Sequence, residues 1–100
     1  MLNITSQNEG NDYTIFLEGR LDVRSAADAD REFARISEAA DNVVLDCEKL
    51  EYVASAGLRA IKRLRLNMKA KNSRLVVRHV TADVMDVFNM TGFSAMLTIE

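Results

Sequence analysis

The sequence predicts a single α/β domain in which strands and helices alternate along the chain. One hundred residues, 48% of them apolar and 28% charged, suit one folded domain with one core and argue against disorder. Proline is absent and glycine occurs only four times, so nothing in the chain looks like a linker. Short strand-like runs alternate with helix-like segments in the order ββαβαβαβ. This order predicts a mixed sheet of about five strands with crossover helices packed against it.

The first half of the chain predicts a hairpin followed by a helix. Residues 2–7 alternate apolar and polar side chains, and a stronger strand pattern covers residues 13–19. The polar cluster at residues 8–12 is typical of a turn between them. A helix is expected from Ser25 to Ala40, and Asp22 is placed to cap or bracket its start. The apolar residues of that helix recur at helical spacing: Ala29, Phe33, Ile36 and Ala40.

The second half predicts three further strands and two helices. A strand at 42–46 is followed by a short connection, a small-residue turn around Ser55 and a helix from about Ala56 to Ala70. After a strand at 75–79, a short helix is expected from Thr81 to near Gly92, since threonine favours helix starts and glycine helix ends. A final strand is expected at 95–99.

The helix from Ala56 to Ala70 has one apolar side and one basic side. Apolar residues fall within a third of its circumference, and Leu66 alone falls among the cations. The apolar side holds Ala60, Ile61, Leu64 and Met68, with Leu58 at its margin; the basic side holds Arg59, Lys62, Arg63, Arg65 and Lys69.

Charge is distributed unevenly about a net charge of −2. Residues 1–51 carry twelve acidic and five basic side chains, whereas residues 52–100 carry three acidic and eight basic ones. The asymmetry is compatible with steering of a charged partner, or with two halves that fold together and leave a solvated basic face. The basic helix could also track the phosphates of a nucleic acid. This alternative is not favoured, because residues 53–87 hold no aromatic side chain that could stack on a base and the net charge is negative.

Catalytic and metal-binding patterns are missing from the sequence. Cys47 and His79 are the only soft metal ligands and stand alone in the chain, so no metal or cofactor is expected. Ser55 has no sequence-local base, and residues 57–62 lack the spacing of a phosphate-binding loop, so the chain is not expected to be an enzyme. No membrane span or leader is recognisable, which together with the single cysteine predicts a cytoplasmic protein.

Ser55 is the most informative single residue because it stands at a predicted helix N-terminus. Its neighbours Ala54, Ala56 and Gly57 are small and leave the hydroxyl uncovered. One interpretation is an N-cap serine that contributes about 1 kcal/mol to helix stability. The other is a hydroxyl that accepts a phosphoryl group from another protein's active site, beside the positive end of the helix dipole.

The whole chain resembles the STAS family, which includes the C-terminal domains of sulfate transporters and the bacterial anti-sigma factor antagonists. The resemblance rests on Gly19-x-Leu21-Asp22, on the Ser55-x-Gly57-Leu58 turn, on the late strand at 75–77 and on the segment Asn89–Phe93. It implies one STAS domain over residues 1–100, with the helices mainly on one face of the sheet.

The resemblance also implies a function, that of a stand-alone anti-sigma factor antagonist. The unphosphorylated protein would bind an anti-sigma factor that is also an ATP-dependent serine kinase, and so release the sigma factor. Phosphorylation of Ser55 would break that complex, and a phosphatase of the PP2C type would reset it. The implied docking surface consists of Asp22, Ala54, Ser55, Ala56, Gly57, Leu58, Arg59, Lys62 and Arg63.

One departure from the family pattern keeps an alternative open. The family usually has aspartate immediately before the phosphorylated serine, and this chain has Ala54. The alternative is a STAS adaptor that is not phosphorylated, such as an accessory subunit of a transporter or a scaffold.

Overall fold

The structure, a computed structural model, describes all residues from 1 to 100. Four strands and three longer helices follow the predicted order, and a fourth, single-turn helix lies near the C-terminus. In chain order they are β1 (Leu2–Glu9), β2 (Asp12–Leu21), α1 (Ala26–Ala39), β3 (Asn42–Val53), α2 (Ser55–Ala70), β4 (Arg74–Arg78), α3 (Ala82–Thr91) and α4 (Phe93–Met96).

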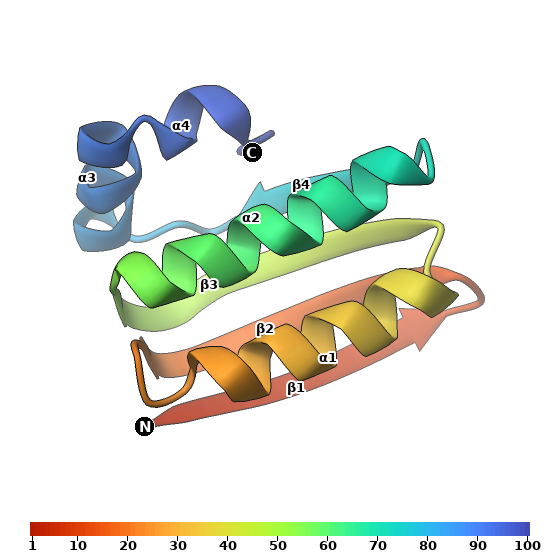
Figure 1. Cartoon of the computed structure of the whole chain (residues 1–100), viewed down its shortest axis with the longest axis horizontal. Coiled ribbons are helices and arrows are strands. Elements are labelled where there is room, and N and C mark those ends of the chain that lie inside the picture. The colour runs from red at the N-terminus through yellow and green to blue at the C-terminus, as the bar shows by residue number, and fades with distance from the viewer.

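The strands form one mixed sheet in the order β1-β2-β3-β4. The first two strands pair antiparallel as the predicted hairpin, closed by Gly10 and Asn11, and the other neighbours pair parallel. Figure 1 shows α1 and α2 lying side by side over one face of this sheet, each starting where the preceding strand ends. The α/β class with helices on one face is therefore confirmed.

The core lies between that face of the sheet and the two covering helices. Alternate residues of β2 and β3 point into it, as do the apolar residues of α1 and α2 that recur at helical spacing. Its largest fully buried side chains are Phe33, Phe88, Ile15, Leu17, Leu21, Ile36, Leu45, Leu50, Ile61, Leu64, Met68 and Val43.

Helix α3 begins and ends with the residues that the sequence indicates. The Thr81 hydroxyl accepts a hydrogen bond from the backbone N–H of Val84, and Gly92 closes the helix in the left-handed region at φ 80°. No helix in the structure is long and apolar enough to cross a membrane.

The prediction that the third strand stops at residue 46 is wrong. Strand β3 continues to Val53, so the residues expected to form a short connection lie inside it. Its register against β2 shifts between Phe16 and Glu18, so the strand carries an irregularity that breaks the simple alternation. Because of that irregularity, the polar residues after Leu45 show the pattern of a loop.

The predicted fifth strand at 95–99 is also wrong. Residues 93–96 form helix α4, and only Ile99 makes a bridge to Val77 of β4. The bridge is held by two backbone hydrogen bonds, from Val77 N–H to Thr98 O and from Glu100 N–H to Val77 O. A short apolar run such as this one fits a helix or a strand equally well by pattern alone.

Candidate functional site

The candidate site lies where β2 and β3 end and where α1 and α2 begin (Figure 1). Because these two strands are parallel, the turns that follow them meet at one edge of the sheet. The backbone N–H of Ala54 donates a hydrogen bond to Leu21 O at 2.9 Å, which ties the Ser55 turn to the Asp22 turn. The sequence separates these two turns by more than thirty residues, and the topology unites them.

Ser55 is the first residue of α2, and its side chain is exposed. The N-cap position belongs to Ala54, whose backbone is extended (φ −101°, ψ 175°) and which has no side chain able to cap. No side-chain capping bond forms at this helix start, so the interpretation of Ser55 as a capping serine is wrong. The Ser55 hydroxyl makes no hydrogen bond within the protein and faces solvent beside the unpaired N–H groups of the first turn.

Gly57 is required by the close approach of α2 to the sheet. A Cβ atom at this position would lie 2.5 Å from Cγ of Leu21 and 2.7 Å from the carbonyl oxygen of Leu21. Any side chain here would push the first turn of α2 away from the end of β2. The glycine of the Ser-x-Gly turn therefore sets where the Ser55 hydroxyl sits relative to the Asp22 turn.

Asp22 organises the neighbouring turn through its backbone and its side chain. Its carbonyl oxygen accepts from the N–H groups of Ser25 and Ala26, and its Oδ1 accepts from the N–H of Arg24 at 3.0 Å. Partial desolvation raises the pKa of Asp22. The N–H groups of Arg24 and Ser25, the charge of the N-terminus and the Ser25 hydroxyl outweigh it and hold the pKa below its usual value. The ionised Asp22 thus fixes the turn that leads into α1. Nε of Arg20 lies 3.9 Å from its Oδ2.

Two of the predicted docking residues are buried. Leu58 is 6% exposed and belongs to the core, and Gly57 is buried against Leu21. Both therefore support the turn from inside and offer little surface to a partner. Ala54 and Ala56 are partly exposed beside the exposed Ser55.

The predicted basic residues divide into engaged and free side chains. Arg63 forms a two-pronged ion pair with Asp30 of α1, at 2.9 Å and 2.5 Å, and this pair raises the pKa of Arg63. Arg63, predicted to face a partner, is thus already engaged within the protein, where it joins α1 to α2. Arg59 and Lys62 are exposed and have no ion pair or side-chain hydrogen bond. With Ser55 they follow the i, i+4, i+7 spacing of one helix face.

Sequence reasoning missed two exposed side chains in this region. Val23, in the Asp22 turn, is 78% exposed, and Tyr52, near the end of β3, is 40% exposed. The guanidinium of Arg20 lies 4.3 Å from the centre of the Tyr52 ring, in cation–π contact. The register of β2 and β3 pairs Arg20 with Tyr52, so the strand pairing alone would have indicated this contact.

Comparison with known protein families decides the assignment. A family model described as "Mlab, STAS domain" matches residues 4–98. The chain belongs to the STAS domain family. The resemblance carried by the Gly19-x-Leu21-Asp22 and Ser55-x-Gly57 turns is therefore confirmed at the level of the family.

One relative by sequence and two solved structures resemble the chain. A protein of Bordetella bronchiseptica named "Putative anti-sigma factor antagonist BtrV" is 27% identical over 83% of this chain and 72% of its own length. An anti-sigma factor antagonist from Mycobacterium paratuberculosis superposes with a TM-score of 0.84 at 13% identity, covering 99% of this chain and 85% of that one.

The second solved structure is the Bacillus cell fate determinant SpoIIAA in its phosphorylated form. It gives a TM-score of 0.76 at 15% identity, over 100% of this chain and 91% of that one. At such identities the two structural likenesses establish the shared fold.

Proposed function

We propose that this STAS domain is an anti-sigma factor antagonist whose docking is switched by phosphorylation of Ser55. In the unphosphorylated state it binds an anti-sigma factor that is also a serine kinase, and so releases the sigma factor. The observation that carries the proposal is the exposed Ser55 hydroxyl, which caps no helix and bonds to no other group in the protein. Likeness to BtrV and to phosphorylated SpoIIAA supports the same reading.

The docking surface proposed for the kinase is centred on Ser55. The small side chains of Ala54 and Ala56 flank Ser55 and leave it accessible. Asp22 lies in the adjoining turn, and Arg59 and Lys62 follow along α2 with no partner inside the protein. We expect these two cations to face an acidic region of the partner, where complementary charge speeds association. Val23 adds an exposed apolar side chain at the rim of the same surface.

Phosphorylation of Ser55 would change the charge of this surface more than its shape. A phosphoserine carries about −1.5 to −2 charges at neutral pH. Micromolar binding corresponds to about 8 kcal/mol, and a buried charge left without a partner removes several of those. The N–H groups of the first turn of α2 would hold the phosphate in the free protein, which favours the dissociated state further.

The domain contributes only the acceptor hydroxyl to this chemistry. The kinase supplies ATP, Mg²⁺ and the base that takes the Ser55 proton. A phosphatase of the PP2C type would return the protein to its binding state. The chain itself needs no catalytic residue for either step.

A second candidate function is a STAS adaptor that is not phosphorylated, such as a transporter subunit. Ala54 favours it, because a kinase that uses an aspartate beside the acceptor serine for orientation would find none in this chain. The two functions share the docking surface and differ in whether Ser55 accepts phosphate.

Pull-down from the native cell distinguishes them, with wild type, Ser55→Ala and Ser55→Asp as baits. We expect wild type and Ser55→Ala to capture an ATP-using serine kinase, and Ser55→Asp to lose it. Ser6→Asp is the matched control, because Ser6 is an exposed serine on β1, away from the Ser55 turn. Capture of transporter subunits by all four baits, with no phosphate on Ser55 by mass spectrometry, supports the adaptor.

A further inference from the structure

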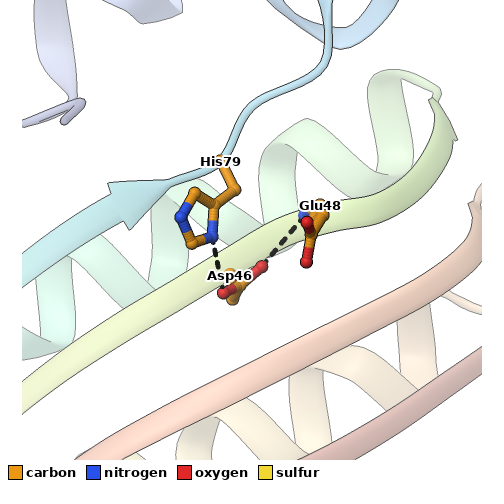
Figure 2. Close-up of side chains that lie close together, drawn as sticks. All are labelled: Asp46, Glu48 and His79. Atoms are coloured by element: carbon orange, nitrogen blue, oxygen red, sulfur yellow. Dashed lines mark hydrogen bonds and ion pairs between the residues drawn. The ribbon is translucent and has the colours of Figure 1, made fainter.

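A second cluster of polar side chains lies on the face of the sheet that α1 and α2 leave uncovered. Asp46 and Glu48 alternate with the core residues Leu45 and Cys47 along β3, so both project away from the helices. His79 follows the last residue of β4, and the parallel register pairs Asp46 with Arg78, its neighbour. Figure 2 shows the three side chains together, with the helices passing behind the strands. The fold thus places His79, which stands alone in the sequence, beside two carboxylates.

The ligand atoms of these three residues converge. Nδ1 of His79 lies 2.9 Å from Oδ2 of Asp46. Each of the three residues has one ligand atom, and these three atoms all lie within 4.8 Å of one another. The other Asp46 oxygen, Oδ1, accepts the backbone N–H of Glu48 at 3.0 Å, which fixes the orientation of the carboxylate. Asp46 is 8% exposed, whereas Glu48 and His79 are exposed and free to adjust.

Negative charge in this cluster is not neutralised by a lysine or an arginine. Neither Asp46 nor Glu48 forms an ion pair with either residue type; the one lysine nearby, Lys49, pairs with Glu18 at 3.8 Å. Arg78 points to Glu100 instead, at 3.1 Å. Asp46 is largely buried, and the only side chain that pairs with its carboxylate is the imidazole of His79.

A cavity adjoins two residues of the cluster, Asp46 and Glu48, but is not lined by His79. Asp46 and Glu48 line a cavity of about 320 Å³ together with Glu18, Asn3, Thr5 and Gln7, and its only cationic side chain is Lys49. His79 itself is held at φ 58°, a left-handed conformation that is uncommon for residues other than glycine. The fold therefore accepts an unfavourable backbone at the residue whose imidazole meets Asp46.

We propose that Asp46, Glu48 and His79 form a site for a divalent transition-metal ion of the Zn²⁺ type. One imidazole and two carboxylates are typical zinc ligands, and three protein ligands leave a position for water or for a partner's side chain. An all-oxygen site would favour Mg²⁺ or Ca²⁺, whereas the imidazole favours Zn²⁺. Zinc bonds of about 2.0–2.2 Å place neighbouring ligand atoms roughly 3.3 Å apart, so the Asp46–His79 pair has to open by only a few tenths of an ångström.

This site is separate from the Ser55 turn. Val53 lies seven positions after Asp46 along β3, which corresponds to roughly 23 Å of strand. The metal would join β3 to the segment after β4 on the open face of the sheet. Its binding is thus independent of the proposed switch.

The test is a Zn²⁺ titration of tag-free protein, followed by the imidazole nitrogen resonances of its single histidine. We expect one equivalent to bind and to shift the His79 signals. His79→Asn and Glu48→Gln should each weaken binding at least about tenfold, since each removes a metal ligand. Asparagine is chosen because it tolerates the left-handed backbone.

Glu38→Gln is the matched control, because it removes an exposed carboxylate from α1, on the other side of the sheet, and should bind Zn²⁺ as wild type does. Zn²⁺ should also raise the melting temperature of wild type but not of His79→Asn. Unchanged imidazole signals in excess Zn²⁺, or wild-type affinity in His79→Asn, would overturn the proposal.

Discussion

At the scale of single residues, the start of α2 combines a weak helix terminus with an available hydroxyl. Ala54 occupies the N-cap without a capping side chain, and the first turn of α2 contains no acidic residue. The helix therefore begins without the stabilisation that Thr81 gives to α3. A phosphate on Ser55 would supply the missing negative charge next to the unpaired N–H groups.

Ala54→Asp should stabilise the protein by about 1 kcal/mol, because aspartate at the N-cap accepts a backbone N–H and complements the helix dipole. The measurement is urea unfolding, with an increased midpoint and an unchanged slope. Ala70→Asp, an acid at the other end of the same helix, is the control and should destabilise. Equal shifts in the two variants would show that the N-terminus of α2 is not the cause.

At the scale of elements, most basic side chains in residues 52–100 are engaged inside the protein. Arg63 pairs with Asp30 of α1, and Arg65 donates to the carbonyl oxygen of Met96 at 2.8 Å. Lys71 Nζ donates to the carbonyl oxygens of Ser37 and Ala40, at 2.6 Å and 2.7 Å, where α1 ends. Part of the basic charge therefore stabilises the fold. Arg59, Lys62 and Lys69 have no partner inside the protein and are free to contact another molecule.

Lys71→Ala should cost about 1 kcal/mol of folding free energy, because it removes a cation that satisfies two carbonyls at the C-terminal end of α1. Lys69→Ala is the matched control, because Lys69 is exposed, lies at the same end of α2 as Lys71 and has no side-chain partner. Its loss should cost at most a few tenths of a kcal/mol of folding free energy. Thermal unfolding of both variants checks the difference. Equal melting temperatures for the two would contradict the assigned role of Lys71.

The elements that the sequence predicted well are those with strong local signals. Thr81 and Gly92 bound α3 as expected, and the apolar spacing of α1 and α2 identified their buried sides. The extension of β3 beyond residue 46 escaped prediction because an irregular register hides its alternation. The C-terminal segment escaped because its single bridge to Val77 depends on tertiary placement.

The same limit applies to the site. The position of Ser55 at a predicted helix start and its small neighbours identified it as a candidate site residue. Only the fold could show that Ala54, and not Ser55, is the N-cap residue of α2. The contacts of Arg63 with Asp30 and of His79 with Asp46 each join residues 33 positions apart. Such contacts depend on helix packing and strand order, which no local pattern encodes.

At the scale of the whole molecule, one face of the sheet is sealed by helices and the other is open. Cys47 lies on the sealed side, and burial together with the Asp46 charge raises the pKa of its thiol to about 12. A neutral, buried thiol does not react with alkylating or disulfide reagents. The single cysteine therefore reports on opening of the core.

Native protein at pH 8 should leave Cys47 unlabelled by a thiol reagent on the time scale in which urea-unfolded protein reacts completely. The labelling rate should increase with urea in parallel with the unfolded fraction, which checks that reaction requires opening. Rapid labelling without denaturant would show that the core is accessible in the folded state.

The central claim is that phosphate on Ser55 breaks docking to the kinase partner. The most direct test is calorimetric titration of that partner with unphosphorylated protein and with protein that carries phosphoserine at position 55. The account predicts at least about hundredfold weaker binding of the phosphorylated form, or about 3 kcal/mol. Equal affinity of the two forms would contradict it.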